Sequence, residues 1–247
     1  MDGFNFNRKL FHLIGFFVPA ILYFDFFRGA FDFKFASRSI VFLLVCFLLF
    51  SMSIIEVIRL NNPKFNEFYL KNFGKIMKEA ERNRMNGVVP YMLSNAIIVA
   101  IFPSQIIFMS MAYLLIGDPL AAYFGSKYGK YRFSNGKSLI GVLAFVIASS
   151  IAGIILMIIF QSTYNDSLLS FYENGRTNFN GLIIIFIGAI SAGIAEFLSG
   201  HAWKGFLEDN LLIPLVSSVV LTFLLIIVEN KTLGELIFPI NDLFLKI

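Results

Sequence analysis

Long apolar stretches separated by short polar segments run through most of the 247-residue sequence. About 20 consecutive apolar residues suffice for a helix to cross a bilayer, and the run over residues 139–160 is the clearest of these stretches. Only 15% of the residues are charged and 57% are hydrophobic, which is outside the usual composition of soluble domains. The sequence therefore predicts an all-α, polytopic integral membrane protein. The seven expected transmembrane helices cover residues 10–27, 40–57, 88–102, 106–118, 139–160, 181–198 and 211–228.

An amphipathic segment lies between the second and third of these stretches. After Pro63, apolar residues recur at helical spacing while lysines occupy other positions, as in a helix that lies in the membrane surface. The apolar positions are Phe65, Phe68, Tyr69, Phe73, Ile76, Met77 and Ala80. No small-residue cleavage site follows the first apolar stretch, so we expect it to be a membrane helix and not a signal peptide. We expect residues 1–247 to form one membrane-embedded domain.

The basic residues predict how the helices are oriented. With seven spans, 14 of the 20 Lys and Arg residues fall on one side of the membrane and six on the other. Because cytoplasmic loops carry the excess of Lys and Arg, the first side is predicted to be cytoplasmic. The N-terminus then lies in the cytoplasm and the C-terminus on the opposite side, in a bacterial or archaeal plasma membrane or in the endoplasmic reticulum. Basic residues spread among membrane loops argue against nucleic acid as a partner.

Asp118 is the most unusual residue of the apolar stretches. It follows the apolar run over 106–116, so it lies at or near membrane depth, where an ionisable side chain is costly and is a candidate for function. Asp118 and Pro119 also match an N-cap followed by proline at the first helical position. We therefore expect the membrane helix to break there and to restart as a half-helix that lines a cavity.

Glycines and polar residues alternate after Asp118. Backbone N–H groups exposed at glycines, together with mobile cations, suit the binding of a polyphosphate. The candidates are Gly125, Lys127, Gly129, Lys130, Lys137, Ser138 and Gly141. Two structural alternatives remain open. Ala121, Gly125 and Gly129 are four residues apart and could let two helices pack closely, and the lysines could simply flank a membrane span.

Further polar residues are predicted to lie on the same face as Asp118. They are Arg8, His12, Arg84, Glu196, Asp209 and Asn210. Soluble nucleotides are available on that face, and acidic residues could hold Mg²⁺ there. The structural alternatives are a cap on the last span for Asp209 and Asn210, and an interface position for His12. Glu196 lies near the end of an apolar stretch, where an unpaired acid is costly.

Taken in order, these motifs resemble those of the polyprenol kinase family, which includes dolichol, phytol and farnesol kinases and CTP-dependent diacylglycerol kinases. The matching elements are Arg8-Lys9-x-x-His12, Arg84-x-x-Gly87, Gly117-Asp118-x-x-Ala121 with Gly125 and Gly129, Lys137-Ser138-x-x-Gly141, and Glu196 with Asp209-Asn210. One position departs from the pattern. Ile140 stands where the family commonly has an acidic residue, so Glu196 or Asp209 would have to serve instead.

The central stretch is also similar to that of the membrane phosphatidate cytidylyltransferases, which make CDP-diacylglycerol. Those enzymes carry a C-terminal signature of paired basic residues, Lys-Asp, His-Gly-Gly and Asp-Arg, which this sequence lacks. Glu196 and Asp209-Asn210 match the kinase pattern instead. A kinase is therefore the favoured prediction, and a cytidylyltransferase is the alternative.

The resemblance implies transfer of the γ-phosphate of CTP, or of another nucleoside triphosphate, to the hydroxyl of a membrane lipid alcohol. That alcohol would be a polyprenol or dolichol, a phytol-like or farnesol-like alcohol, or diacylglycerol. The resemblance also implies catalytic roles for Asp118, Lys137, Glu196 and Asp209, with Mg²⁺ held by the three acids. Phosphate binding would involve Arg8, His12, Arg84, Asn210 and the glycine-rich stretch. The sequence identifies neither the lipid nor an oligomeric state.

A small transporter or membrane scaffold is a further alternative, with Asp118 and Glu196 as ion or proton relays. Transporters commonly show internal symmetry between their halves. No convincing repeat relates residues 1–120 to residues 121–247, and acids gathered on one face do not trace a path across the membrane. The single cysteine, Cys46, excludes a cysteine metal site and a disulfide within the chain.

Overall fold

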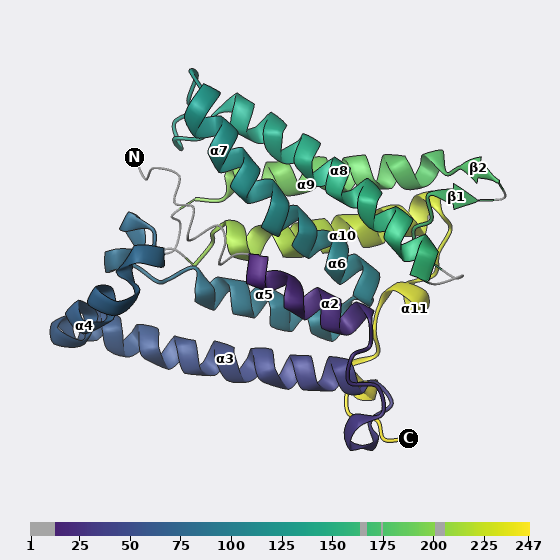
Figure 1. Ribbon diagram of the computed structural model, residues 1–247, viewed down its shortest axis with the longest axis horizontal. Helices are drawn as coiled ribbons and strands as arrows, with labels where there is room; N and C mark the ends of the chain where they lie inside the picture. Colours follow the sequence, from purple (N-terminus) through teal and green to yellow (C-terminus); the bar gives the residue numbers. More distant parts are fainter. Residues whose placement is uncertain (1–12, 164–166, 174, 201–205) are drawn as a thin grey trace.

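The computed structural model describes residues 13–163, 167–173, 175–200 and 206–247, so Arg8 and His12 lie outside the described residues. Within these ranges, five helices are long and apolar enough to cross a membrane. They are α3 (Ala36–Asn61), the continuous helix Ser104–Tyr128, α8 (Leu139–Thr163), α9 (Phe179–Leu198) and α10 (Asp209–Val228). α3, α9 and α10 run along the long axis of the molecule, and Ser104–Tyr128 and α8 cross it obliquely (Figure 1).

Within the described residues, two of the seven expected spans are short helices. Ile14–Tyr23, made of η1 (Ile14–Phe16) and α2 (Phe17–Tyr23), and α5 (Val88–Ile101) are apolar but shorter than the other five. The smaller helical pieces are η2 (Ala30–Asp32), α4 (Pro63–Phe73), η3 (Gly74–Ile76), η4 (Glu79–Asn83), α11 (Leu233–Leu236) and η7 (Ile240–Asp242). In the described part of the chain, the strands are one two-residue hairpin, β1 (Tyr172–Glu173) and β2 (Arg176–Thr177). The predicted all-α, polytopic membrane fold is confirmed.

The predicted helix break at Asp118 is wrong. α6 (Ser104–Ala112), a π-helical turn η5 (Tyr113–Gly117) and α7 (Asp118–Tyr128) form one uninterrupted helix. Gly117 and Asp118 both have right-handed helical φ and ψ, so Asp118 is not an N-cap. The wider π turn shifts the hydrogen-bond register just before Pro119, which has no N–H to donate and would otherwise clash with the preceding turn. π turns of this kind are frequent at functional sites.

The amphipathic helix is shorter than the predicted residues 63–80. α4 begins after Asn62, whose side-chain oxygen accepts hydrogen bonds from two N–H groups of the first turn. It ends before Gly74, because glycine has a low helix propensity. Met77 is extended and separates η3 from η4, so the lysines of this stretch do not share one helical face. Its location in the membrane surface stays a prediction.

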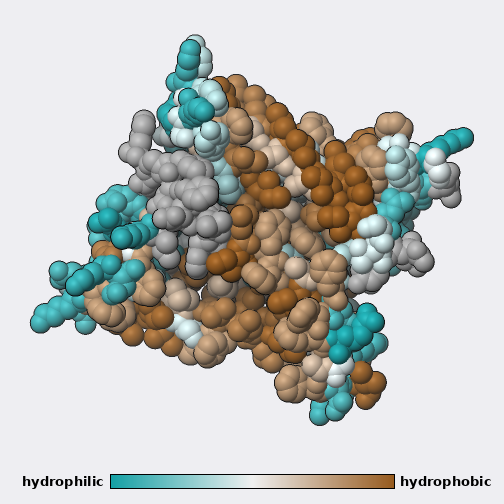
Figure 2. Space-filling model, in the orientation of Figure 1, coloured by the Kyte–Doolittle hydropathy of each residue, from teal (hydrophilic) through white to brown (hydrophobic). Residues whose placement is uncertain are grey.

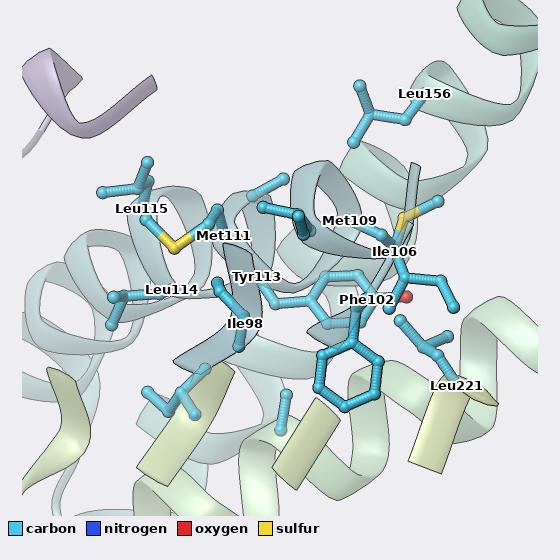
Figure 3. Close-up of a cluster of buried hydrophobic side chains, with 14 of the residues drawn as sticks. Ile98, Phe102, Ile106, Met109, Met111, Tyr113, Leu114, Leu115, Leu156 and Leu221 are labelled. Carbon is cyan, nitrogen blue, oxygen red and sulfur yellow. The ribbon is translucent and has the colours of Figure 1, made fainter. Parts of the chain in front are cut away.

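The helix Ser104–Tyr128 lies at the centre of the bundle. In its most apolar window, 67% of the residues are buried within the protein, compared with 17% for α3. Figure 3 shows the buried side chains that surround α6 and the π turn. The labelled residues are Ile98, Phe102, Ile106, Met109, Met111, Tyr113, Leu114, Leu115, Leu156 and Leu221. Asp118 therefore belongs to the most enclosed helix, whereas α3 presents most of its surface outward.

Apolar side chains cover the sides of the molecule, and hydrophilic side chains gather at its ends (Figure 2). At one end lie α4, the starts of α5, α8 and α10, and the ends of α3, α7 and α9 (Figure 1). The β hairpin, α11 and the C-terminus lie at the other end (Figure 1). The elements that carry the described candidate residues therefore converge at one end, which we call the site end.

Candidate active site

Four acidic residues gather at the site end. Asp118 begins α7, Glu196 lies in the last turn of α9, and Asp209 begins α10 directly after Glu208. Asp118 is only 9% exposed and Glu196 only 8%. Asp118 and Asp209 both act electrostatically on Glu196, so the three carboxylates lie within electrostatic range at this end of the bundle. The fold thus brings together the three acids that the sequence analysis selected.

A buried ion pair in α3 holds a neighbouring stretch, residues 78–87, in place. The Arg59 side chain is 0% exposed, and its guanidinium contacts both carboxylate oxygens of Glu56, at 2.7 and 2.9 Å. The same guanidinium donates to three carbonyl oxygens of the stretch, those of Glu81, Arg82 and Arg84. Glu56 accepts a backbone N–H of the stretch at 2.9 Å. Because a buried charge is stable only when its hydrogen bonds are satisfied, α3 and residues 78–87 form one unit.

Lys78 connects this stretch to the acidic residues. Its ammonium lies 3.2 Å from Oδ1 and 3.4 Å from Oδ2 of Asp209, and 3.5 Å from Oε2 of Glu208. Burial opposes the charge of this lysine, but the surrounding carboxylates, led by Asp209, outweigh it and raise the pKa of Lys78 above its ordinary value. Asp118 and Glu81 contribute to the same field. Sequence reasoning missed this role, because it assigned Lys78 to the polar face of a surface helix.

Glu208 is a second residue that sequence reasoning missed. It is the residue before α10 and accepts a hydrogen bond from Nδ2 of Asn210 at 3.2 Å. Burial raises the pKa of Glu208 above its ordinary value, while Lys78 lowers it and Asp209 raises it further. Asn210 also donates to the carbonyl oxygen of Gly87 at 3.2 Å, which ties α10 to residues 78–87. A Cβ at Gly87 would overlap the side-chain ends of Glu208 and Asn210, which would have to move aside.

Lys137 binds the end of α9. Its ammonium lies 2.8 Å from Oε1 of Glu196, and it donates to the Glu196 carbonyl oxygen and, at 3.0 Å, to Oγ of Ser199. Ser199 also donates to the Glu196 carbonyl, at 2.6 Å. The last carbonyl groups of a helix have no partner within the helix, so Lys137 and Ser199 together cap α9. Lys137 therefore positions the predicted acid Glu196.

The glycine-rich stretch packs α7 against α8. A Cβ on Gly125 would lie 3.3 Å from the Cα of Gly141, and a side chain at Gly129 would overlap the Gly125 carbonyl and Ser138. Ser138 precedes α8, and its Oγ accepts the N–H of Gly141 at 3.1 Å, as an N-cap does. These residues make the close helix contact that small side chains permit. Phosphate binding at Gly125, Gly129, Ser138 and Gly141 stays a prediction.

The other predicted phosphate-binding cations are on the surface of the site end. Lys127 is exposed, donates to the Tyr123 hydroxyl at 3.2 Å and lies 5.2 Å from the centre of the Tyr128 ring. Lys130 is exposed in the loop after α7. Arg84 is exposed, while its carbonyl oxygen is held by α3. These three cations are therefore accessible to a ligand from solvent.

The arrangement of the acids bears on the predicted magnesium site. No group of three or more His, Cys, Asp or Glu side chains is arranged to hold a metal ion among the described residues, so Asp118, Asp209 and Glu196 do not form a complete metal cage. The donor chemistry still fits Mg²⁺ that arrives with a nucleotide, because Mg²⁺ is usually bound by one or two carboxylates together with phosphates. The ammonium of Lys78 between Asp209 and Glu208 marks a position that already holds a positive charge.

Known proteins similar to this chain include lipid kinases. The chain is 34% identical over 171 residues to CTP-dependent diacylglycerol kinase 1 of Schizosaccharomyces pombe, which is 67% of this chain and 72% of that protein. It is 28% identical over 173 residues to CTP-dependent diacylglycerol kinase 1 of Saccharomyces cerevisiae, 67% of this chain and 58% of that protein. An uncharacterized protein of Rickettsia prowazekii is 30% identical over 220 residues, 87% of this chain and 92% of that protein.

No family model and no solved structure matches the chain. The similarity to the S. pombe kinase nevertheless extends over two thirds of both proteins. The motifs quoted from the sequence indicate the same group of enzymes. The chain therefore belongs to the family of membrane lipid kinases that contains the CTP-dependent diacylglycerol kinases.

Proposed function

We propose that this protein is a CTP-dependent kinase that transfers the γ-phosphate of CTP to the hydroxyl group of a membrane lipid, with diacylglycerol as the first acceptor to test. The observation that carries this proposal is the similarity to two kinases that are named for CTP and diacylglycerol. Polyprenol, dolichol, phytol-like and farnesol-like alcohols are the other acceptors that the motifs imply. The gathered acids support phosphoryl transfer, because this chemistry depends on positioning and charge neutralisation more than on covalent catalysis.

The reaction would take place at the start of α7 and α10. Asp118 and Asp209 would hold Mg²⁺, which neutralises charge on the triphosphate. Glu196, positioned by Lys137, would complete the acidic group, and one of these acids would accept the proton of the lipid hydroxyl. Exposed cations would attract the nucleotide to this end. The surface candidates are Arg84, Lys127 and Lys130, and the motifs imply Arg8 and His12 as well.

The lipid would approach from the apolar sides of the molecule (Figure 2). A groove of about 400 Å³ between α7 and α8 is lined by apolar side chains, which include Leu120, Phe124, Ile140, Leu143 and Ile147. Ile140 stands where the family commonly has an acid. Because this position lines the apolar groove, an apolar side chain suits it. The groove suits a substrate with one polar group on a long apolar body.

We further propose that the site end faces the cytoplasm. Of the Lys and Arg residues in the described ranges, more lie at this end than at the opposite end. Single cysteines introduced by Lys130→Cys and Asn230→Cys in a Cys46→Ser background would test this topology. In right-side-out vesicles, a membrane-impermeant maleimide should label Asn230→Cys and leave Lys130→Cys unlabelled. The reverse pattern would place the site outside.

The activity can be tested with purified protein in mixed micelles that contain Mg²⁺, a panel of lipid alcohols and phosphatidate. CTP is labelled separately at the α or the γ phosphorus. Transfer of γ label to diacylglycerol would support the proposal, and transfer to another alcohol would change the acceptor. Transfer of α label with release of pyrophosphate would identify a cytidylyltransferase. No transfer from CTP, ATP, GTP or UTP would contradict both enzyme functions and favour a transporter or scaffold.

A further inference from the structure

Lys78 lies in the position where a cation would sit between the acids at the start of α10. Its ammonium contacts three carboxylate oxygens, two from Asp209 and one from Glu208, at 3.2, 3.4 and 3.5 Å. Strong charge-assisted hydrogen bonds are shorter, about 2.7–2.9 Å. The arrangement therefore resembles several oxygens that share one cation more than a single directed ion pair.

The backbone of Lys78 is fixed, although its side chain is long. Its N–H donates to Oε2 of Glu81 at 2.7 Å, and Arg59 holds the Glu81 carbonyl oxygen at 3.1 Å. A lysine ammonium is carried on a flexible four-carbon stem. The Lys78 side chain is 23% exposed, so it lies at the edge of the protein and is not fully enclosed. The backbone of Lys78 is therefore held in place, while its side-chain ammonium can change position.

We propose that Lys78 is a tethered counter-ion that neutralises Asp209, with Glu208 as a second contact, while nucleotide is absent and moves to the phosphates when metal and nucleotide bind together. This inference rests on the proposed function. An ammonium and a divalent cation repel each other when both lie against the same carboxylates. The triphosphate removes the conflict, because its oxygens give Lys78 a new anionic partner. The metal then binds weakly alone and tightly with nucleotide.

Mn²⁺ binding to the full-length protein in detergent tests this proposal without any turnover. The free ion is measured by its electron paramagnetic resonance signal, first without nucleotide and then with CTP. Lys78→Met removes the charge and keeps an unbranched side chain of similar length. We expect Lys78→Met to bind Mn²⁺ alone about tenfold more tightly than the wild type, and CTP to increase Mn²⁺ affinity less in the variant. Lys78→Arg, which keeps the charge, should bind Mn²⁺ as the wild type does.

Lys71→Met is the matched control, because Lys71 is an exposed lysine in the last turn of α4. Its Mn²⁺ affinity should equal that of the wild type. Thermal unfolding checks that each variant is folded, and Lys78→Gln replaces Lys78→Met if the latter is not. If the folded variant at Lys78 binds Mn²⁺ no more tightly than the wild type, Lys78 is not a counter-ion that competes with the metal. Failure of the wild type to phosphorylate any lipid would overturn the proposed function instead, while this binding comparison would still decide the role of Lys78.

Discussion

Two lysines meet carboxylates at the site end, but they do so in different ways. Lys137 lies 2.8 Å from Glu196 and also donates to the groups that close the end of α9. Lys78 makes longer contacts, of 3.2 to 3.5 Å, with carboxylate oxygens of Asp209 and Glu208. The first lysine holds a helix end, whereas the second balances negative charge. Mutations at the two positions should therefore change different properties of the protein.

The largest effect is expected at Asp118, whose charge acts on both Lys78 and Glu196. Asp118→Asn keeps the shape of the side chain and removes its charge. We expect phosphoryl transfer to fall about 10³-fold, because a carboxylate that would hold Mg²⁺ against the triphosphate is lost. The initial rate with γ-labelled CTP measures this effect, and membrane insertion serves as the control. Activity within a few fold of the wild type would show that Asp118 is not part of the active site. It would also contradict a shared electrostatic role for Asp118 beside Lys78 and beside Glu196, the partner of Lys137.

Lys137 and Lys78 can be separated by measuring stability and activity together. Lys137→Ala should lower phosphoryl transfer and also reduce the free energy of unfolding by about 1–3 kcal/mol, because the last turn of α9 loses its partner. Lys78→Met should lower transfer with a smaller loss of stability. Thermal unfolding and initial rates of both variants provide the measurements. Equal losses of stability would contradict the distinction between the lysines.

The α7–α8 contact supports the loop that carries Lys137, so it should behave as packing. Gly129→Ala would force a side chain against the Gly125 carbonyl and Ser138. We expect it to reduce the free energy of unfolding by about 1–3 kcal/mol, the usual cost of overpacking. Gly234→Ala is the control, because no atom lies within 4 Å of its added Cβ. Weaker CTP binding by Gly129→Ala with unchanged stability would instead support a phosphate-binding glycine.

The smallest effect is expected in the pH dependence of stability near Lys78. Because the pKa of Glu208 is raised in the folded protein, the folded state holds this proton more tightly than the unfolded state. The resulting stability is full below the ordinary pKa of 4.5 and is lost as the pH rises through the raised value. Glu208→Gln should lack this loss, a difference of roughly 2–4 °C in unfolding temperature. If the unfolding temperatures of the wild type and of Glu208→Gln change equally with pH, the raised pKa of Glu208 is contradicted.

The membrane fold was predictable because an unpaired backbone is so costly in lipid that each long apolar run must form a helix. The geometry at Asp118 was not predictable in the same way. Asp118-Pro119 fits an N-cap as well as it fits a helix interior, and no local motif indicates the π turn that precedes the proline. The local pattern therefore identified Asp118 as a candidate residue but did not predict its backbone conformation.

The partners of the acids could not be predicted from local patterns either. Lys78 and Glu208 are 130 residues apart. They meet because Arg59 holds residues 78–87 against α3 and Asn210 ties the same stretch to α10. One signal was present in the sequence: Glu208 directly precedes Asp209-Asn210 at the start of an apolar stretch. Glu208 therefore lies at the same end of α10 as Asp209 and Asn210.

Among the five long helices, α3 has the smallest buried share of its apolar window, 17%. It also carries Arg59, which holds the stretch on which Lys78 sits. A helix that meets lipid over most of its surface responds to bilayer thickness by tilting. Tilting of α3 would move residues 78–87 with it, and the distance between Lys78 and Asp209 would change. The thickness of the bilayer would then influence the contact between Lys78 and Asp209.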